Sequence, residues 1–262
     1  MNQAADVTVL ERLLRRDRSM ALLALIAAVL LAWTYLLAGI GMEGHSMSMP
    51  DMAMPGAPDW TASRFALMFA MWGIMMVATM LPGAAPMILL FATIERRRRD
   101  HSPLPATLRF AGAYVAVWLG FSLVATLLQW QLDRLTLLSS AMATTSALLS
   151  AVILIAAGIY QFTPWKQACL RNCRTPLEFI SAHWSRGAFG IGLRHGLYCL
   201  GCCWMIMLLL FVGGVMNLVW VALIATYILA EKALPRAIGV SYGMGAVLIG
   251  WGAWTLYAMT MA

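Results

Sequence analysis

The sequence predicts an all-α, polytopic helical bundle that crosses a membrane about seven times. The first observation is composition: of 262 residues, 62% are hydrophobic and 11% are charged, whereas a soluble domain needs more polar surface. The second is that the positive mean hydropathy of +0.79 comes with apolar runs of about 20 residues, the length of a bilayer-spanning helix. The third is that arginines flank these runs, as membrane-topology signals do. Alternating ten-residue strands of a barrel are absent from the sequence, so helices are expected.

We expect one membrane domain over residues 1–262, with its N-terminus in the cytoplasm and its C-terminus outside (N-in/C-out). Lysine and arginine place the N-terminal segment 1–19 and the Cys-containing loop 163–191 on the cytoplasmic side, and the Met-rich loop 41–64 on the periplasmic side. The first apolar run is interpreted as a retained anchor rather than a signal peptide, because it lacks a convincing cleavage site. The predicted spans are 20–40, 65–91, 110–130, 142–162, 192–212, 216–233 and 238–259.

The formal net charge of +7 does not indicate nucleic-acid binding. The arginines flank apolar segments and do not form a basic face of a soluble domain. The expected surroundings are instead the lipid bilayer of an inner membrane.

Two prolines interrupt the second predicted span. Pro82 and Pro86 each remove a backbone donor and clash one turn back, so a kink or a break is expected there. A packing kink and a functional break both fit the sequence.

Methionine gives the first chemical signal. Eleven of the 20 methionines lie at or between Met42 and Met87. In the polar loop they bury nothing, and a thioether is a soft, uncharged ligand suited to copper(I). A biased linker is the alternative. The candidate ligands of the loop are His45, Met47, Met49, Met52 and Met54.

The methionine pattern continues into the second span. Met71, Met75, Met76 and Met80 form two Met-x-x-x-Met pairs, which place sulfurs one helical turn apart. This spacing resembles that of Ctr-type copper transporters over one helix only. Packing and a metal pathway are both open interpretations of the stripe.

The five cysteines give a sharper signal, because all lie between residues 169 and 203. Cys169 and Cys173 are four residues apart, and Cys199-x-x-Cys202-Cys203 follows His195 by four. On a helix the second group shares one stripe. Thiols facing the cytoplasm stay reduced, which favours metal binding or thiol redox chemistry over structural disulfides. Buried cysteines that act only as small hydrophobic side chains are the alternative. The adjacent Glu231 and Lys232 are interpreted as the hydrated end of the sixth span, with a functional site as the alternative.

Several runs together resemble a bacterial family of predicted metal-binding integral membrane proteins, domain of unknown function 2182. The resemblance covers about residues 65–235 and implies a bacterial membrane protein that binds metal. The matching runs are Met71-Trp72-x-x-Met75-Met76-x-x-x-Met80-x-Pro82, Gly158-Ile159-Tyr160-Gln161-Phe162-Thr163-Pro164-Trp165-Lys166, Cys169-Leu170-Arg171-x-Cys173-Arg174-x-Pro176, His195-Gly196-x-Tyr198-Cys199-x-Gly201-Cys202-Cys203-Trp204, Met216-Asn217-Leu218 and Glu231-Lys232.

The sequence therefore predicts a copper(I)-handling protein of the bacterial inner (plasma) membrane, acting in transport or delivery; another soft metal is possible on the same donors. The loop methionines would collect the ion and the second span would pass it on. His195 and Cys199, Cys202 and Cys203 would receive it, with Cys169 and Cys173 as a handover pair. A metallochaperone or a copper enzyme is the partner expected. The rivals are a thiol–disulfide oxidoreductase, a mercury-type transporter and an assembly subunit with structural metal; a non-enzymatic role is favoured.

Overall fold

A computed structural model describes residues 3–38, 60–98, 102–139, 142–234 and 237–261. In these residues the secondary structure is helical, apart from one isolated β-bridge between Leu138 and Thr144. The all-α prediction is confirmed for this part of the chain. The helices are α1 (Gln3–Leu37), α2 (Ala62–Arg98), α3 (Leu104–Arg134), α4 (Ala147–Gln161), α5 (Pro164–Arg174), α6 (Pro176–His183), the 3-10 turn η2 (Trp184–Arg186), α7 (Gly187–Leu208), α8 (Leu210–Gly213), α9 (Leu218–Ala233) and α10 (Ala237–Met261).

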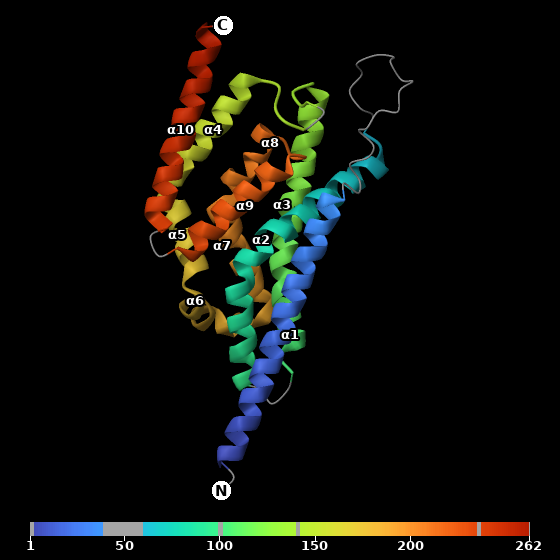
Figure 1. The fold of residues 1–262 in the computed structure, drawn as a ribbon, viewed down its shortest axis with the longest axis vertical. Coiled ribbons are helices and arrows are strands. Elements are labelled where there is room, and N and C mark those ends of the chain that lie inside the picture. Colours follow the sequence, from blue (N-terminus) through green and yellow to red (C-terminus); the bar gives the residue numbers. More distant parts are fainter. Residues whose placement is uncertain (1–2, 39–59, 99–101, 140–141, 235–236, 262) are drawn as a thin grey trace.

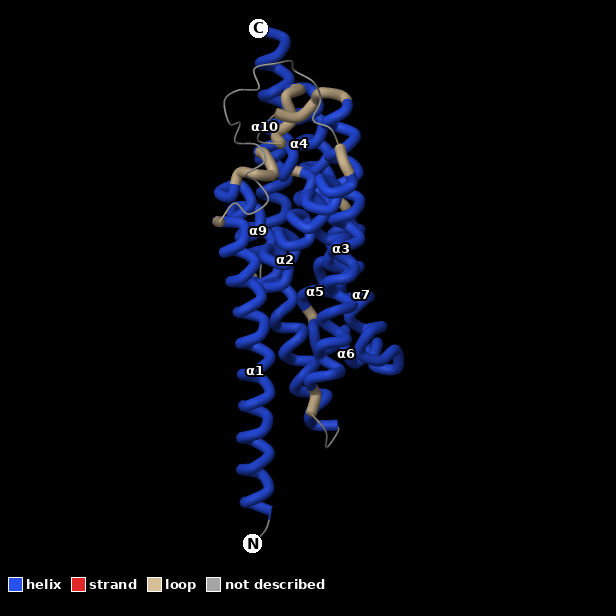
Figure 2. Tube along the Cα trace, turned by 90° about the vertical axis from the view of Figure 1, so that its right-hand side faces the viewer, coloured by secondary structure: helices blue, strands red, loops and turns tan. Residues whose placement is uncertain are grey.

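Five of the described helices are long and apolar enough to cross a membrane, or six if the bent pair α4–α5 is one span. The seven-span count is not confirmed, because α4 has 15 residues and α9 has 16. α1 begins at one end of the molecule and α10 finishes at the other (Figures 1 and 2). The N-in/C-out arrangement stays a prediction.

Capping residues explain why the two shorter helices begin where they do. The side chain of Ser146 accepts a hydrogen bond from the Leu149 amide at the start of α4, and Asn217 accepts one from Trp220 at the start of α9. α4 stops before Pro164, which cannot continue a helix but suits the first turn of the next. Thr163, in an extended conformation, caps α5, and the two helices meet at 64°.

The segment 163–191, predicted as a cytoplasmic Cys-containing loop, is largely helical, and its cytoplasmic location stays a prediction. It forms α5, α6, η2 and the start of α7, and α5 lies against α7 (Figure 2). Lys166 and Leu170 of α5 are buried. The polar composition suggested a solvated loop because the sequence does not show that one face of α5 packs on α7.

α2 lies at the centre of the packing and runs unbroken through Pro82 and Pro86. Figure 1 shows that the helix changes direction midway, so the prolines bend α2 without ending it. The side chains of Trp72, Met76 and Phe91 are fully or almost fully buried along it. α2 therefore carries core contacts through most of its length.

Glycines bring neighbouring helices into backbone contact. A Cβ at Gly192 of α7 would lie 2.2 Å from the carbonyl oxygen of Phe110 in α3, and one at Gly158 of α4 would lie 2.8 Å from that of Gly245 in α10. Only glycine fits such distances. The Gly192 contact holds α7 close to α3, which helps to place the cysteines of α7 in the core, and the Gly158 contact holds α4 close to α10.

Candidate metal centre

Three cysteines of α7 lie together in the core. Cys199, Cys202 and Cys203 are 0%, 1% and 1% exposed. The spacing i, i+3, i+4 places them on one side of the helix. The thiols of Cys202 and Cys203 both donate to the carbonyl oxygen of Cys199, at 3.1 and 2.9 Å. The structure thus brings the predicted stripe of thiols together.

The two cysteines of α5 lie against this stripe. The Cys173 side chain lies near Cys199 and Cys202, close enough to interact with both. Cys169, one turn earlier, packs on Gly201, where an added Cβ would lie 2.8 Å from its sulfur. All five cysteines are free thiols. The pair predicted for handover therefore adjoins the group predicted to receive the metal.

α2 adds a thioether. The Cys203 sulfur lies 3.9 Å from the Met80 sulfur, which is fully buried. We call Met80, Cys173, Cys199, Cys202 and Cys203 the sulfur cluster. The other predicted methionines, Met71, Met75 and Met76, are buried on α2 on the N-terminal side of Met80.

Two polar side chains reach the cluster: Lys232, for which a functional site was the alternative interpretation, and Tyr114, which the sequence did not single out. The Lys232 ammonium of α9 donates to the Cys199 sulfur at 3.0 Å. The Tyr114 hydroxyl of α3 lies 3.1 Å from the same sulfur and donates to the carbonyl oxygen of Met80 at 3.0 Å. A Cβ at Gly83 would lie 3.0 Å from the Lys232 nitrogen. Glycine next to Pro82 thus leaves space for the lysine to pass α2.

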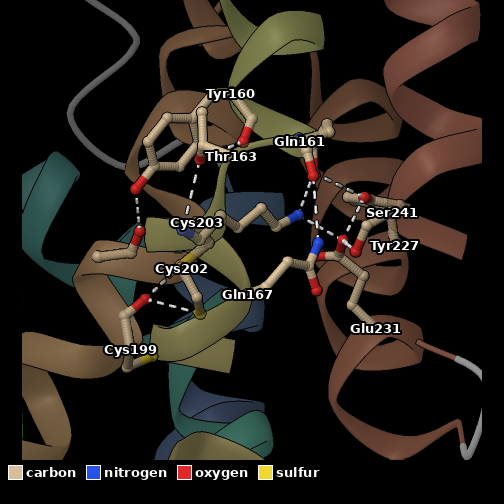
Figure 3. A network of polar contacts seen from close by, with 12 residues as sticks. Tyr160, Gln161, Thr163, Gln167, Cys199, Cys202, Cys203, Tyr227, Glu231 and Ser241 are labelled. Carbon is tan, nitrogen blue, oxygen red and sulfur yellow. Dashed lines mark hydrogen bonds and ion pairs between the residues drawn. The ribbon is translucent and has the colours of Figure 1, made fainter. Parts of the chain in front are cut away.

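Glu231 does not lie at a hydrated helix end, as the sequence suggested. It is 1% exposed and forms an ion pair with the equally buried Lys166 of α5. The same carboxylate oxygen accepts hydrogen bonds from Tyr227 and Ser241, both at 2.5 Å, as Figure 3 shows. Lys166 also donates to the Gln161 side chain. This ion pair fastens α5 to α9, and α5 carries Cys173 two turns further on.

Lys232 lies in the last turn of α9, as predicted, but its side chain is partly buried and not simply hydrated. Lys232 turns inward to Cys199, while its neighbour Glu231 turns to Lys166. Successive residues point about 100° apart around a helix, so the adjacent pair serves two sites. A charged pair within an apolar run was the signal, since buried charges in such runs usually have a specific partner.

His195 lies one turn before Cys199 and is 2% exposed. Its ring stacks on Tyr114 at 5.5 Å and packs edge-on against Phe179 at 5.7 Å. Nδ1 has no hydrogen-bond partner among the described residues. Burial without a partner is costly for a ring nitrogen, and the neutral imidazole nitrogen is a possible metal ligand.

The cluster is not a preformed metal site. Within the described residues, no three His, Cys, Asp or Glu side chains are arranged as ligands around one point. The reason is visible in the thiols of Cys202 and Cys203, which turn back to a carbonyl oxygen. Rotation of these two short side chains would be needed before several sulfurs could share one ion. The predicted loop ligands His45, Met47, Met49, Met52 and Met54 lie outside the described residues.

Comparison with protein families gives a match over most of the chain. A family model described as "PpoB2: Copper chaperone" matches residues 69–255, which include all five cysteines and Met80. No curated protein and no solved structure matches the chain.

Proposed function

The chain belongs to the PpoB2 copper chaperone family, and from this we propose that it holds copper(I) in the sulfur cluster and delivers it to a partner protein. The observation that carries the proposal is the convergence of α2, α5 and α7 on a group of four thiols and one thioether beside Lys232. Thiolate and thioether are the ligands that soft copper(I) prefers.

Charge supports a thiolate-bound monovalent ion. A copper(I) ion bound by two thiolates carries one negative charge, and burying it without a counter-charge is costly. The Lys232 ammonium, 3.0 Å from the Cys199 sulfur, supplies that counter-charge. Binding in this way releases the two thiol protons. Met80 adds a third soft donor without changing the charge.

The arrangement of α5 supports a role in delivery. Cys173 adjoins Cys199 and Cys202, and Cys169 is the next thiol on the same helix. Both are only partly buried, unlike the thiols of α7. Copper(I) can therefore pass by ligand exchange from α7 to α5, and from α5 to a metallochaperone or a copper enzyme.

The proposed setting is the bacterial inner membrane, with seven spans and an N-in/C-out arrangement. The membrane setting is supported by the five or six helices that are long and apolar enough to cross a bilayer. The seven spans and the N-in/C-out arrangement are supported by the distribution of lysine and arginine. In this setting the Met-rich loop 41–64 collects copper(I) on the periplasmic side. The methionines of α2 then pass it to the sulfur cluster.

The test is copper(I) binding by the anaerobically purified full chain. Replacement of Cys199, Cys202 and Cys203 by serine should abolish the tightest binding step in a competition titration with a copper(I) chelator. Met207→Leu is the matched control, since Met207 is a fully buried residue of the same helix. Unchanged stoichiometry and affinity in the triple variant would contradict the proposal. A reversible disulfide in the metal-free protein, together with unchanged copper binding, would favour a thiol oxidoreductase.

A further inference from the structure

A second group of sulfur atoms lies away from the sulfur cluster, around the side chain of Gln129 in α3. The Gln129 amide nitrogen donates to the Met142 sulfur at 3.0 Å and to the Met68 sulfur at 3.5 Å. Its carbonyl oxygen accepts from the Trp72 indole nitrogen at 2.8 Å. All four side chains are at most 3% exposed. Three separate parts of the chain therefore converge here: α2, α3 and the connection between α3 and α4.

Hydrogen bonding fixes the orientation of the amide. An indole N–H can only donate, so the Gln129 carbonyl oxygen must face Trp72 and the NH₂ group must face the two sulfurs. Both thioethers thus direct lone pairs toward one electropositive point. A thioether is a weak acceptor, and a buried NH₂ group held by sulfur alone is poorly satisfied compared with one held by oxygen.

The backbone at Met142 is unusual as well. Met142 has a φ of 55°, the left-handed region that residues with a Cβ seldom adopt and that costs on the order of 1–3 kcal/mol. Hydrogen bonds from Met142 N to Ser139 O and from Thr144 N to Phe211 O hold the turn in place. Glycine or asparagine would adopt this conformation with less strain. A methionine held here brings its sulfur to Gln129.

We propose that Met68, Met142 and Gln129 form a second binding site for a soft monovalent cation such as copper(I). The cation takes the point that the amide NH₂ now occupies. The Gln129 amide moves aside and keeps its carbonyl oxygen on the Trp72 indole nitrogen, so the two thioether sulfurs are the ligands and the three side chains line the site. All three are neutral, so the site holds the ion without releasing protons and less tightly than thiolates would.

The second site rests on the proposed copper(I) function and extends it along α2. Met68 and Met80 are 12 residues apart, about 18 Å along a helix. Met71, Met75 and Met76 lie between them, all buried, with successive sulfur-bearing residues about 2–6 Å apart in rise. A weak neutral site at one end and a thiolate site at the other would give an ion a direction of transfer toward the sulfur cluster.

The experiment uses Ag(I), a soft and redox-inert stand-in for copper(I), and methionine methyl NMR of the full chain in detergent. The signals of Met68, Met142 and Met87 are assigned by the variants M68L, M142L and M87L. Leucine conserves volume well enough for these cores to fold. Met87 is the matched control, because it is a 2% exposed methionine of α2 outside both groups. Binding is followed in the wild type and in C199S/C202S/C203S.

The methyl signals of Met68 and Met142 should shift together along one Ag(I) isotherm in both proteins, while that of Met87 stays unchanged. M68L/M142L should lose this binding step and M87L should keep it. The inference is overturned if Ag(I) saturates the chain while the Met68 and Met142 signals do not move, or if M68L/M142L binds Ag(I) as M87L does. Failure of the proposed function has a different signature, since it is unchanged copper(I) affinity in the cysteine variant.

Discussion

Glu231→Gln is expected to destabilise the protein strongly. The Glu231 carboxylate is 1% exposed and pairs with Lys166, which is fully buried, and it also accepts from Tyr227 and Ser241. Glutamine keeps the shape but leaves the Lys166 ammonium without a counter-charge. Removing one partner of a buried pair costs about 3–5 kcal/mol. The Gln161 side chain still accepts from Lys166, so a loss near the lower value is expected.

The assay is the free energy of unfolding in detergent micelles, followed by circular dichroism as denaturant is added. Glu178→Gln is the control, because Glu178 is exposed on α6; its effect should stay within about 0.5 kcal/mol. In Lys166→Met/Glu231→Gln neither charge is left unpaired, so the double variant should lose less than the sum of the two single losses. Additive losses, or a loss below about 1 kcal/mol for Glu231→Gln, would refute the reasoning.

Three further substitutions test the cluster and its support. Lys232→Met should weaken copper(I) binding by about 10–100-fold in a chelator competition, a range typical of residues that support metal ligands; an unchanged affinity would contradict the counter-charge argument. Gly83→Ala places a Cβ 3.0 Å from the Lys232 nitrogen, so it should displace the ammonium from Cys199 and weaken copper(I) binding. The unfolding transition should stay close to that of the wild type. Gly192→Ala would place a Cβ 2.2 Å from the Phe110 carbonyl oxygen. It should lower the free energy of unfolding by about 1–3 kcal/mol. A free energy of unfolding equal to that of the wild type would contradict the backbone contact between α3 and α7.

Hydropathy predicted the long helices because each contains a stretch that is apolar enough to cross a bilayer. It was less successful where local capping sets the ends. Ser146 and Asn217 begin α4 and α9, and Pro164 separates α4 from α5. Hydropathy also failed for 163–191, because a helix with several charges can still bury one face against a neighbour, as α5 does with Lys166.

For the candidate site, helical periodicity predicted which side chains share one face of a helix. It did not predict which side chains of different helices come into contact. The spacing of Cys199, Cys202 and Cys203 is enough to place them on one side of α7. The approach of Cys173 and the inward turn of Lys232 depend on contacts between distant parts of the chain. No local pattern carries that information, and the same holds for the group around Gln129.

The charges near the sulfur cluster are those of the buried Lys166 and Glu231 and the partly buried Lys232. If Glu231 paired with its neighbour Lys232, the cluster would have no counter-charge for a metal bound by two thiolates. Lys166 prevents this, because it takes the Glu231 carboxylate in an ion pair and leaves Lys232, which has no ion pair among the described residues, to approach Cys199. The three charges sum to one positive charge beside the thiols. That charge matches a copper(I) dithiolate and does not match a divalent ion bound by two thiolates, which is already neutral. In the proposed function, the ion pair of α5 and α9 therefore positions Cys173 and leaves one positive charge for a bound monovalent metal.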